Sequence, residues 1–140
     1  MLARRIEREL MPAAEKYGLG LLPYVPLASG LLTGKYRRHA QMPMQSRLTA
    51  TPRLADRYLT ERNWGITEEL ADFAAGQGHS LVELAFSWLL SRSAAPSVNA
   101  GATRPEQVIQ NVRSGLGGWM PPPLKRLMIS LAVTSPKEKS

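Results

Sequence analysis

A run of residues at a predicted helix start has the composition of an anion site: Gly101-Ala102-Thr103-Arg104-Pro105-Glu106. Thr103 and Glu106 have the spacing of a capping box, and Pro105 falls in the first turn, where a missing N–H costs nothing. A helix start leaves N–H groups free and carries a partial positive charge, to which Arg104 adds a full one. Phosphate binds at such places. The same pattern is also typical of an ordinary capped surface helix.

A second glycine-containing loop, residues 26–35, follows a predicted strand directly. Ligand-binding loops lie at the carboxyl ends of strands in parallel α/β proteins. The loop is not a Walker A motif, which needs four residues between its glycines and Ser or Thr after the lysine. Here three residues separate Gly30 from Gly34, and Tyr36 follows Lys35. Together with the helix start, this loop favours a ligand that carries phosphate.

The sequence contains no catalytic cluster. His39 lies in a basic loop and His79 in a turn, so neither is predicted to be a metal ligand or a catalytic base. Without cysteine there is no disulfide, no thiolate nucleophile and no cysteine-type zinc site. We therefore predict no catalytic residue and no metal ligand in this chain.

The elements before the loop alternate between helix and strand. Residues 3–17 read as a helix that ends at Gly18, and Pro12 either kinks it or begins a second segment. The apolar run 19–25 predicts a strand buried on both faces. Helix followed by buried strand is the rhythm of an α/β fold.

The second half continues this rhythm after a long, polar, arginine-rich stretch, residues 36–64, which we expect to be irregular. Thr67 is predicted to cap a helix over 68–75, and Ser80 with Glu83 forms a capping box for the next. That second helix carries a stripe of core-facing residues: Leu81, Leu84, Ala85, Trp88 and Leu89.

A short strand over 96–100 then leads into the helix that runs through Val112. Beyond Gly115 the pattern degrades, and residues 124–133 are interpreted as one short helix. The last residues, 136–140, read as a loose tail.

Length and charge limit the function classes. The 140 residues predict one domain, and no apolar run approaches the roughly 20 residues of a membrane span. A net charge of +7 could suit nucleic acid, but the basic residues are dispersed and aromatic residues make up only 6%. We therefore expect a cytoplasmic protein with no nucleic-acid and no membrane partner.

Both loops, in this order, resemble those of the aldo-keto reductases: Tyr24-Val25-Pro26-Leu27-Ala28-Ser29-Gly30-Leu31-Leu32-Thr33-Gly34-Lys35 and Gly101-Ala102-Thr103-Arg104-Pro105-Glu106-Gln107. The branch most resembled contains the potassium-channel β-subunits and many bacterial oxidoreductases. The resemblance implies a (β/α)₈ TIM barrel, which needs about 250 residues. This chain would supply its C-terminal portion over residues 1–119, an incomplete barrel of two parallel strands with flanking helices. Residues 120–140 are then a divergent tail.

The resemblance also implies NADPH as cofactor and an aldehyde or ketone as substrate. The implied cofactor-binding residues fall in two groups. The first group would lie by the nicotinamide, the pyrophosphate and the adenosine end of the cofactor. It contains Tyr24, Pro26, Leu27, Ala28, Ser29, Lys35 and Arg47. The second, by the adenine and 2′-phosphate, contains Gly101, Thr103, Gln107, Gln110 and Asn111.

The chain departs from the family at several points. The family's catalytic Asp, Tyr, Lys and His belong to the N-terminal two-thirds, so a general acid for the carbonyl is not expected here. Val25 stands where the family commonly has Ser, and Asn99 replaces an apolar strand residue. Two parallel strands cannot close a barrel, so Leu21, Leu22, Trp88 and Val98 are expected to lack partners.

Three interpretations follow from these departures. The chain is an aldo-keto-reductase-type oxidoreductase fragment without turnover of its own, a non-catalytic NADP-binding module, or a piece that docks onto a complementing barrel fragment. A truncated or split gene product and a partly folded remnant are hypotheses of the same kind.

Overall fold

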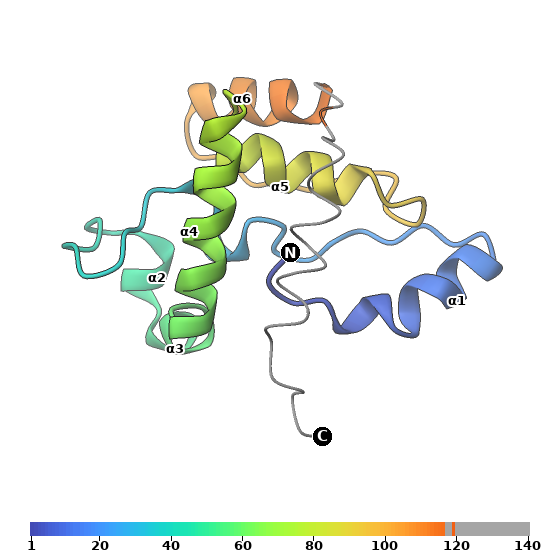
Figure 1. Cartoon of the computed structure of the whole chain (residues 1–140), viewed down its shortest axis with the longest axis horizontal. Helices are drawn as coiled ribbons and strands as arrows, with labels where there is room; N and C mark the ends of the chain where they lie inside the picture. Colours follow the sequence, from blue (N-terminus) through green and yellow to red (C-terminus); the bar gives the residue numbers. More distant parts are fainter. Residues whose placement is uncertain (117–118, 120–140) are drawn as a thin grey trace.

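The computed structural model describes residues 1–116 and 119, and every regular element within them is helical (Figure 1). In chain order, with η marking a 3-10 helix, the elements are η1 (Arg5–Glu7), α1 (Leu10–Lys16), η2 (Ala28–Thr33), α2 (Arg47–Ala50), α3 (Pro52–Tyr58), α4 (Glu61–Gly76), α5 (Leu81–Leu90) and α6 (Pro105–Leu116).

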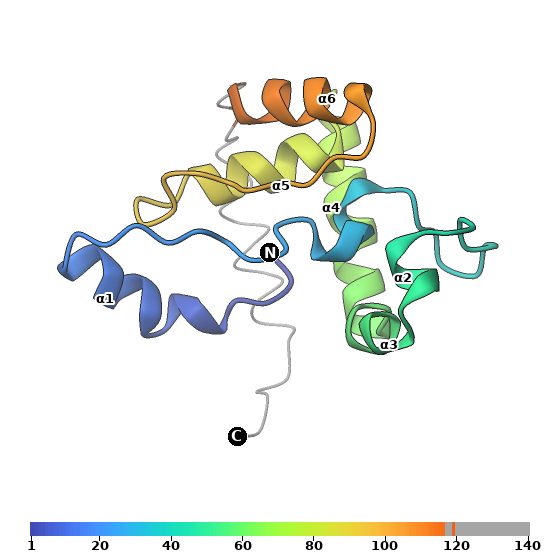
Figure 2. The same ribbon diagram turned by 180° about the vertical axis from the view of Figure 1, so that it is seen from behind.

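Helix α5 lies at the centre of the arrangement. It contacts α4, α6 and η2, while α2 and α3 pack against η2. Figure 1 shows α6 above α5, with α2 and α3 on one side of the molecule and α1 on the other, and Figure 2 shows the same arrangement from behind. Because α5 contacts both η2 and α6, it stands between the two elements that carry the predicted ligand loops.

The core gathers around α5. Four leucines from four different helices are the largest fully buried side chains: Leu31, Leu48, Leu70 and Leu84. The stripe predicted for α5 is confirmed, since Leu81, Leu84, Ala85 and Trp88 are buried and Leu89 packs against the same cluster. The expectation that Trp88 lacks a partner is therefore wrong, because helices of this chain enclose it. Burying apolar side chains in this way is the main favourable contribution to folding.

Local sequence signals fix the start of α5 and the end of α4. Ser80 accepts a hydrogen bond from the Glu83 N–H at 3.2 Å, and Glu83 accepts one from the Ser80 N–H at 2.7 Å. This is the predicted capping box. Just before it, Gly78 has a φ of 76°, and the His79 N–H reaches the Ala74 carbonyl at 2.9 Å, which closes α4 in a Schellman motif.

The prediction of an irregular stretch over residues 36–64 is wrong in its second half. Helices α2 and α3 and the start of α4 lie there. Pro52 is the first residue of α3, where proline favours a helix instead of breaking one. Thr60, not Thr67, caps α4 by accepting from the Asn63 N–H at 3.2 Å. Thr67 lies buried in the middle of that helix.

The N-terminal helix is divided, as one of the two interpretations of Pro12 proposed. Helix η1 ends at Glu7, and α1 begins at Leu10, which places Pro12 in its first turn. The chain leaves α1 through Gly18, whose φ is 65°. The Leu19 N–H then donates to the Ala14 carbonyl at 2.8 Å, which completes a Schellman motif.

The two predicted strands are not formed within residues 1–116 and 119. Residues 19–25 and 96–100 are irregular. A backbone hydrogen bond from the Leu21 N–H to the Ala94 carbonyl, at 2.6 Å, joins the first segment to the turn just before the second. Leu19 and Leu22 are 60% and 67% exposed, so this run is not buried on both faces. A strand of a buried parallel sheet pairs with neighbouring strands and is covered on both faces, and the described residues supply no second strand for residues 19–25.

The last described helix is longer than predicted. Helix α6 continues to Leu116 instead of ending at Val112. Residues 120–140, with the predicted helix over 124–133 and the tail, lie outside the described residues. Among the described helices, none combines the length and apolar character that crossing a membrane requires.

Candidate functional site

The loop around η2 has an uncommon backbone conformation. Val25, Ala28 and Ser29 have φ angles of 52°, 49° and 57°, and Gly30 follows at 96°. Such values are uncommon outside glycine, and for a β-branched residue such as Val25 they mark a true outlier. Each costs about 1–3 kcal/mol and persists where the surroundings fix it, often beside a ligand. The conformation of this loop therefore marks it as a candidate binding site.

Ser29 places an unsatisfied hydroxyl in this loop. Its side chain is 6% exposed, and its Oγ has no hydrogen-bond partner. A buried polar group without a partner costs about 1–3 kcal/mol. A ligand oxygen that reaches the loop would remove this cost.

Lys35 brings a positive charge to the same loop. Its Nζ lies 5.0 Å from the centroid of the Tyr36 ring. A Cβ on Gly30 would come within 3.2 Å of that Nζ, so the missing side chain of Gly30 leaves room for the cation. The Lys35 ammonium thus lies beside Gly30, the residue after Ser29.

Neighbouring side chains hold the loop in place. The Thr33 hydroxyl donates to the Gly30 carbonyl at 2.7 Å. The Tyr36 ring is buried, and its hydroxyl accepts a hydrogen bond from the Leu48 N–H at 3.4 Å. Leu48 follows the exposed Arg47 on α2. The Tyr36 contact therefore ties the loop to the helix that carries the predicted adenosine-end arginine.

The remaining residues of the first predicted group differ in exposure. Tyr24 is 87% exposed and Ala28 is buried, while Pro26 and Leu27 are half-buried. An exposed ring beside a strained loop is free to stack on a planar ligand. The loop therefore offers a hydroxyl, a cation and an aromatic ring.

The second predicted group lies at the start of α6 and is largely exposed. Gly101, Thr103 and Gln110 are exposed, and Gln107 and Asn111 are half-buried. The Thr103 N–H and hydroxyl donate to Gln107 Oε1 at 2.8 and 3.2 Å. Glu106 is not the partner, so the predicted capping box is wrong by one position. Since α6 begins at Pro105, Gln107 is its third residue and reaches back where Glu106 cannot.

The two predicted groups are not joined to each other in the described part of the chain. No hydrogen bond or ion pair connects residues 24–47 with residues 101–111. Helix α5, which contacts η2 and α6, stands between them. The η2 loop, which contains most of the first group, has features of a binding site. That both groups bind one ligand together stays a prediction.

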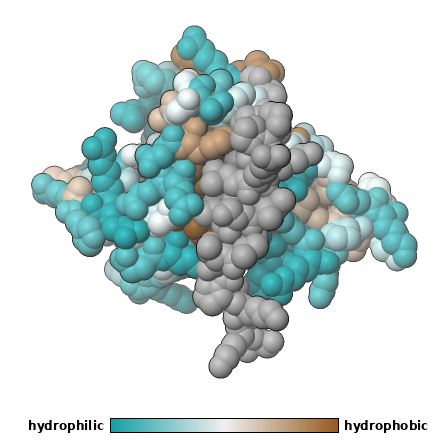
Figure 3. All heavy atoms as spheres, viewed as in Figure 1, coloured by the Kyte–Doolittle hydropathy of each residue, from teal (hydrophilic) through white to brown (hydrophobic). Residues whose placement is uncertain are grey.

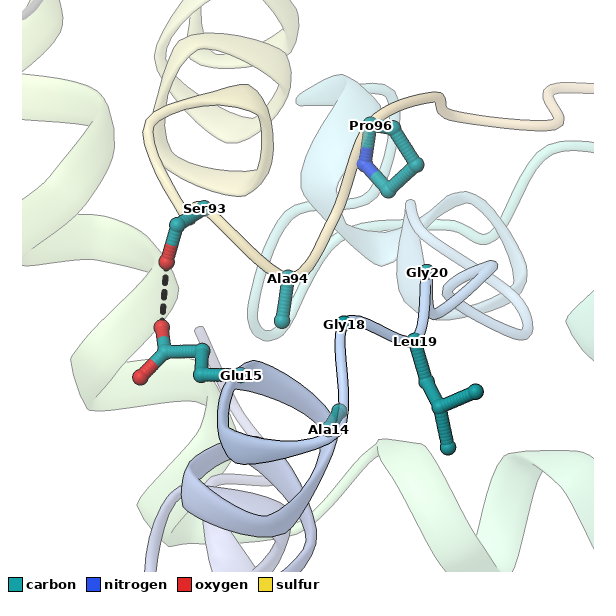
Figure 4. A pocket seen from close by; sticks show the side chains of 8 residues that line it. All are labelled: Ala14, Glu15, Gly18, Leu19, Gly20, Ser93, Ala94 and Pro96. Atoms are coloured by element: carbon teal, nitrogen blue, oxygen red, sulfur yellow. Dashed lines mark hydrogen bonds between the residues drawn. The ribbon is translucent and has the colours of Figure 1, made fainter.

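Surface depressions lined by described residues also lie away from the η2 loop, among them the following two. One of about 640 Å³ lies between the end of α1 and the turn after α5, where the Ser93 hydroxyl donates to the Glu15 carboxylate (Figure 4). The other, of about 530 Å³, lies between α5 and α6 and includes Gln110 of the predicted residues. Neither depression coincides with the η2 loop.

Sequence reasoning missed an aromatic contact near α5. Trp119 stacks on His79, with ring centroids 4.0 Å apart, and on Phe73 at 6.3 Å. The His79 Nδ1 lies 3.7 Å from Glu83 Oε1. No spacing rule links residues so far apart in sequence. Within the described residues, no group of three or more His, Cys, Asp or Glu side chains could hold a metal ion.

Comparison with known proteins identifies the family. The model of the aldo/keto reductase family matches residues 1–116. A probable voltage-gated potassium channel subunit beta from Oryza sativa is 38% identical over 112 residues, which are 79% of this chain and 34% of that protein. The L-glyceraldehyde 3-phosphate reductase of Escherichia coli is 34% identical over 119 residues, which are 81% of this chain and 34% of that protein.

A solved structure agrees with these relatives. The glycerol dehydrogenase of Gluconobacter oxydans superposes with a TM-score of 0.75 at 26% identity, over 99% of this chain and 42% of that one. The chain thus spans about a third of the length of the curated relatives it matches. The resemblance drawn from the two loops is confirmed, and the chain belongs to the aldo/keto reductase family.

Proposed function

We propose that this chain provides the NADP(H)-binding part of an aldo-keto-reductase-type oxidoreductase that acts on an aldehyde or a ketone. The η2 loop carries the proposal. It combines left-handed backbone at Ala28 and Ser29, an unsatisfied buried hydroxyl and a lysine held against Gly30. These features suit an anionic ligand that donates no proton, such as a pyrophosphate.

Each group has a proposed role. The Lys35 ammonium would neutralise pyrophosphate charge, and the Ser29 hydroxyl would donate to one of its oxygens. The exposed ring of Tyr24 would stack on the nicotinamide. At the other end, the free N–H groups of the first α6 turn and the exposed Arg104 would hold the 2′-phosphate. Arg47, Gln107, Gln110 and Asn111 would line the adenosine.

The reaction needs more than this surface. The bound cofactor supplies a hydride to a carbonyl carbon, and a general acid must protonate the carbonyl oxygen. We assign no residue of this chain to that role. In the proposed enzyme the acid comes from β/α units of the family fold outside these residues, and the site operates in the cytoplasm without nucleic acid or membrane.

A second function is a non-catalytic NADP-binding module. The features of the η2 loop serve binding alone, and one of the similar proteins is named a channel subunit and not after a reaction. Under this proposal the cofactor binds without turnover.

The test is a titration of NADPH into the purified 140-residue chain, followed by nucleotide fluorescence. Lys35→Met should weaken binding by about tenfold, or about 1.4 kcal/mol. Lys16→Met is the matched control, because Lys16 is also exposed and lies 5.5 Å from the ring of the adjacent Tyr17. Absence of saturable binding, or equal binding by both variants, would contradict the proposal.

Turnover separates the two functions. The test uses a hybrid in which this chain replaces the matching third of the Escherichia coli L-glyceraldehyde 3-phosphate reductase, so that the rest of that protein can provide the general acid. Oxidation of NADPH by the hybrid with a panel of small aldehydes and ketones would support an enzyme. Saturable binding with no oxidation would support the non-catalytic module.

A further inference from the structure

Trp119, beyond the end of α6, lies against the corner where α4 ends and α5 begins. Its indole stacks on the His79 ring, with centroids 4.0 Å apart and the two planes 23° from parallel. The same indole stacks on Phe73, at 6.3 Å and 27°. Trp119 is half-buried and packs against the hydrophobic cluster around α5. These three rings form a stacked set that we call the aromatic clasp.

The backbone holds the His79 ring in a fixed place within this clasp. The His79 N–H donates to the Ala74 carbonyl at 2.9 Å, in the motif that closes α4. The next residue, Ser80, is the N-cap of α5. The His79 side chain is 33% exposed, so solvent protons reach a ring whose position two helix ends determine.

Glu83 turns one free carboxylate oxygen toward that ring. Its Oε2 accepts hydrogen bonds from the Ser80 N–H and hydroxyl at 2.7 and 2.8 Å. Its Oε1 lies 3.7 Å from His79 Nδ1, a distance at which an ion pair forms once the imidazole is protonated. The Ser80 hydrogen bonds hold the pKa of Glu83 below its ordinary value of 4.5. The carboxylate is therefore charged throughout the range, about pH 5 to 8, in which imidazoles exchange protons.

The other charged groups around the clasp belong to α4 and α6. Asp72 precedes Phe73 on α4 and is exposed. Glu106 and Arg113 of α6 line the depression that also includes Glu83, and their charges have opposite signs. Within residues 1–116 and 119, the ion-pair partner of His79 is Glu83 and none of these three. A proton on His79 therefore acts through Glu83 and through the face of Trp119.

Protonation adds two attractions to the clasp. A neutral His79 ring only stacks on the indole, whereas a protonated ring places a cation on the indole face and a positive charge beside Glu83. Cation–π contacts and ion pairs at partly exposed sites each favour the closed arrangement by up to about fivefold. Both attractions are present in acid and are lost when the ring releases its proton.

We propose that the aromatic clasp is a pH-sensitive contact in which proton uptake by His79 fastens Trp119 to the corner between α4 and α5, and proton release loosens it. Because Trp119 follows α6 in the chain and α6 packs on α5, the clasp adds a pH-dependent attachment to the helix pair α5–α6. The proposal rests on contacts within this chain and does not depend on cofactor binding.

The experiment measures how well acrylamide quenches the fluorescence of Trp119 in the 140-residue chain, at about pH 5.5 and about pH 8. The other two tryptophans, Trp64 and Trp88, are only 7% and 6% exposed, and their signal is subtracted with the variant Trp119→Phe. A fastened indole is shielded from the quencher. The quenching constant of Trp119 should therefore be about threefold lower at the acidic pH.

Two histidine variants identify the group responsible. His79→Phe keeps a ring for stacking but carries no proton, so quenching of Trp119 should be the same at both pH values. His39→Asn is the control, because it removes the other imidazole of the chain at a φ of 58°, which asparagine tolerates. It should keep the wild-type dependence on pH. Far-UV circular dichroism should be alike for both variants.

A salt series on the wild-type chain tests the same idea without a substitution, and so decides the matter if His79→Phe fails to fold. Salt at about 1 M screens an exposed ion pair and should reduce the effect of pH on quenching. Three results would overturn the proposal. They are equal quenching of wild type at both pH values, an unchanged pH effect in His79→Phe, and a pH effect that salt does not reduce.

Discussion

Two regions of this molecule differ in how far their apolar side chains are buried. Around α5, side chains from η2, α2, α4 and α5 enclose one another, and Leu31, Leu70 and Leu84 are completely buried. In segment 19–24 and along α6, leucines, valines and a tyrosine lie half or more exposed. Figure 3 shows brown apolar surface near the top of the molecule, over α6, among mostly teal hydrophilic atoms.

The difference follows from which partners each element needs. A helix satisfies its own backbone groups and then requires one apolar neighbour, which the next helix in the chain can supply. An extended segment needs strands on its edges as well as covers on its faces. The helices around α5 are therefore enclosed within the described residues, whereas segment 19–24 and the exposed face of α6 are not.

The largest expected contrast lies between two leucines. Leu84→Ala removes a fully buried side chain from α5 and should lower the free energy of unfolding by about 2–5 kcal/mol. Leu22→Ala, at a position 67% exposed, should change it by less than about 0.5 kcal/mol. Urea unfolding followed by circular dichroism measures both. Equal losses would show that segment 19–24 is packed after all.

The capping box of α5 should have the next largest effect. Ser80→Ala removes the acceptor of the Glu83 N–H and should cost about 1 kcal/mol of unfolding free energy. The same urea experiment tests it, with Ser97→Ala, at an exposed position, as the control. A loss no greater than in the control would mean that the start of α5 does not depend on its cap.

The same box predicts a dependence on pH. Hydrogen bonds from the Ser80 backbone and hydroxyl hold the pKa of Glu83 below its ordinary value of 4.5. The carboxylate therefore stabilises the fold above that value, and its contribution is lost as the pH falls through the lowered pKa. Wild type should exceed Glu83→Gln in urea midpoint at neutral pH, and the gap should close below pH 4.5. A gap independent of pH would exclude this cause.

The smallest effect is expected at the start of α6. Thr103→Ala removes the hydrogen bond from the hydroxyl to Gln107 and keeps the one from the backbone N–H. The lost bond is exposed, so water replaces it at little cost. Thr103→Ala should change the unfolding free energy by at most a few tenths of a kcal/mol. A loss as large as that of Ser80→Ala would remove the contrast between a partly buried cap and an exposed one.

Sequence reasoning succeeded where a short-range rule determines the structure. The Ser80–Glu83 box, the glycine end of α1 and the core stripe of α5 all follow from spacings within a single helix. It failed between residues 36 and 64, because a polar, arginine-rich composition was taken to mean irregular structure, whereas α2, α3 and the start of α4 form there and Pro52 begins α3. The error at Glu106 arose because one residue of uncertainty in a helix start changes which side chain can reach back.

The candidate site was predicted in kind but not in geometry. The η2 loop and the family were found from residue types alone, and the family is confirmed. The left-handed backbone at Val25, the buried unpaired hydroxyl of Ser29 and the position of Lys35 against Gly30 could not be predicted. Each depends on how Tyr36, α2 and α5 pack around the loop.

The sequence by itself determined the family, the Ser80–Glu83 cap of α5 and the core-facing stripe of that helix, because these depend on residue type and local spacing. The tertiary structure decided which polar groups are left without partners and which apolar residues remain exposed. Those outcomes depend on contacts between distant segments, and no local pattern shows whether a predicted strand will find its neighbour.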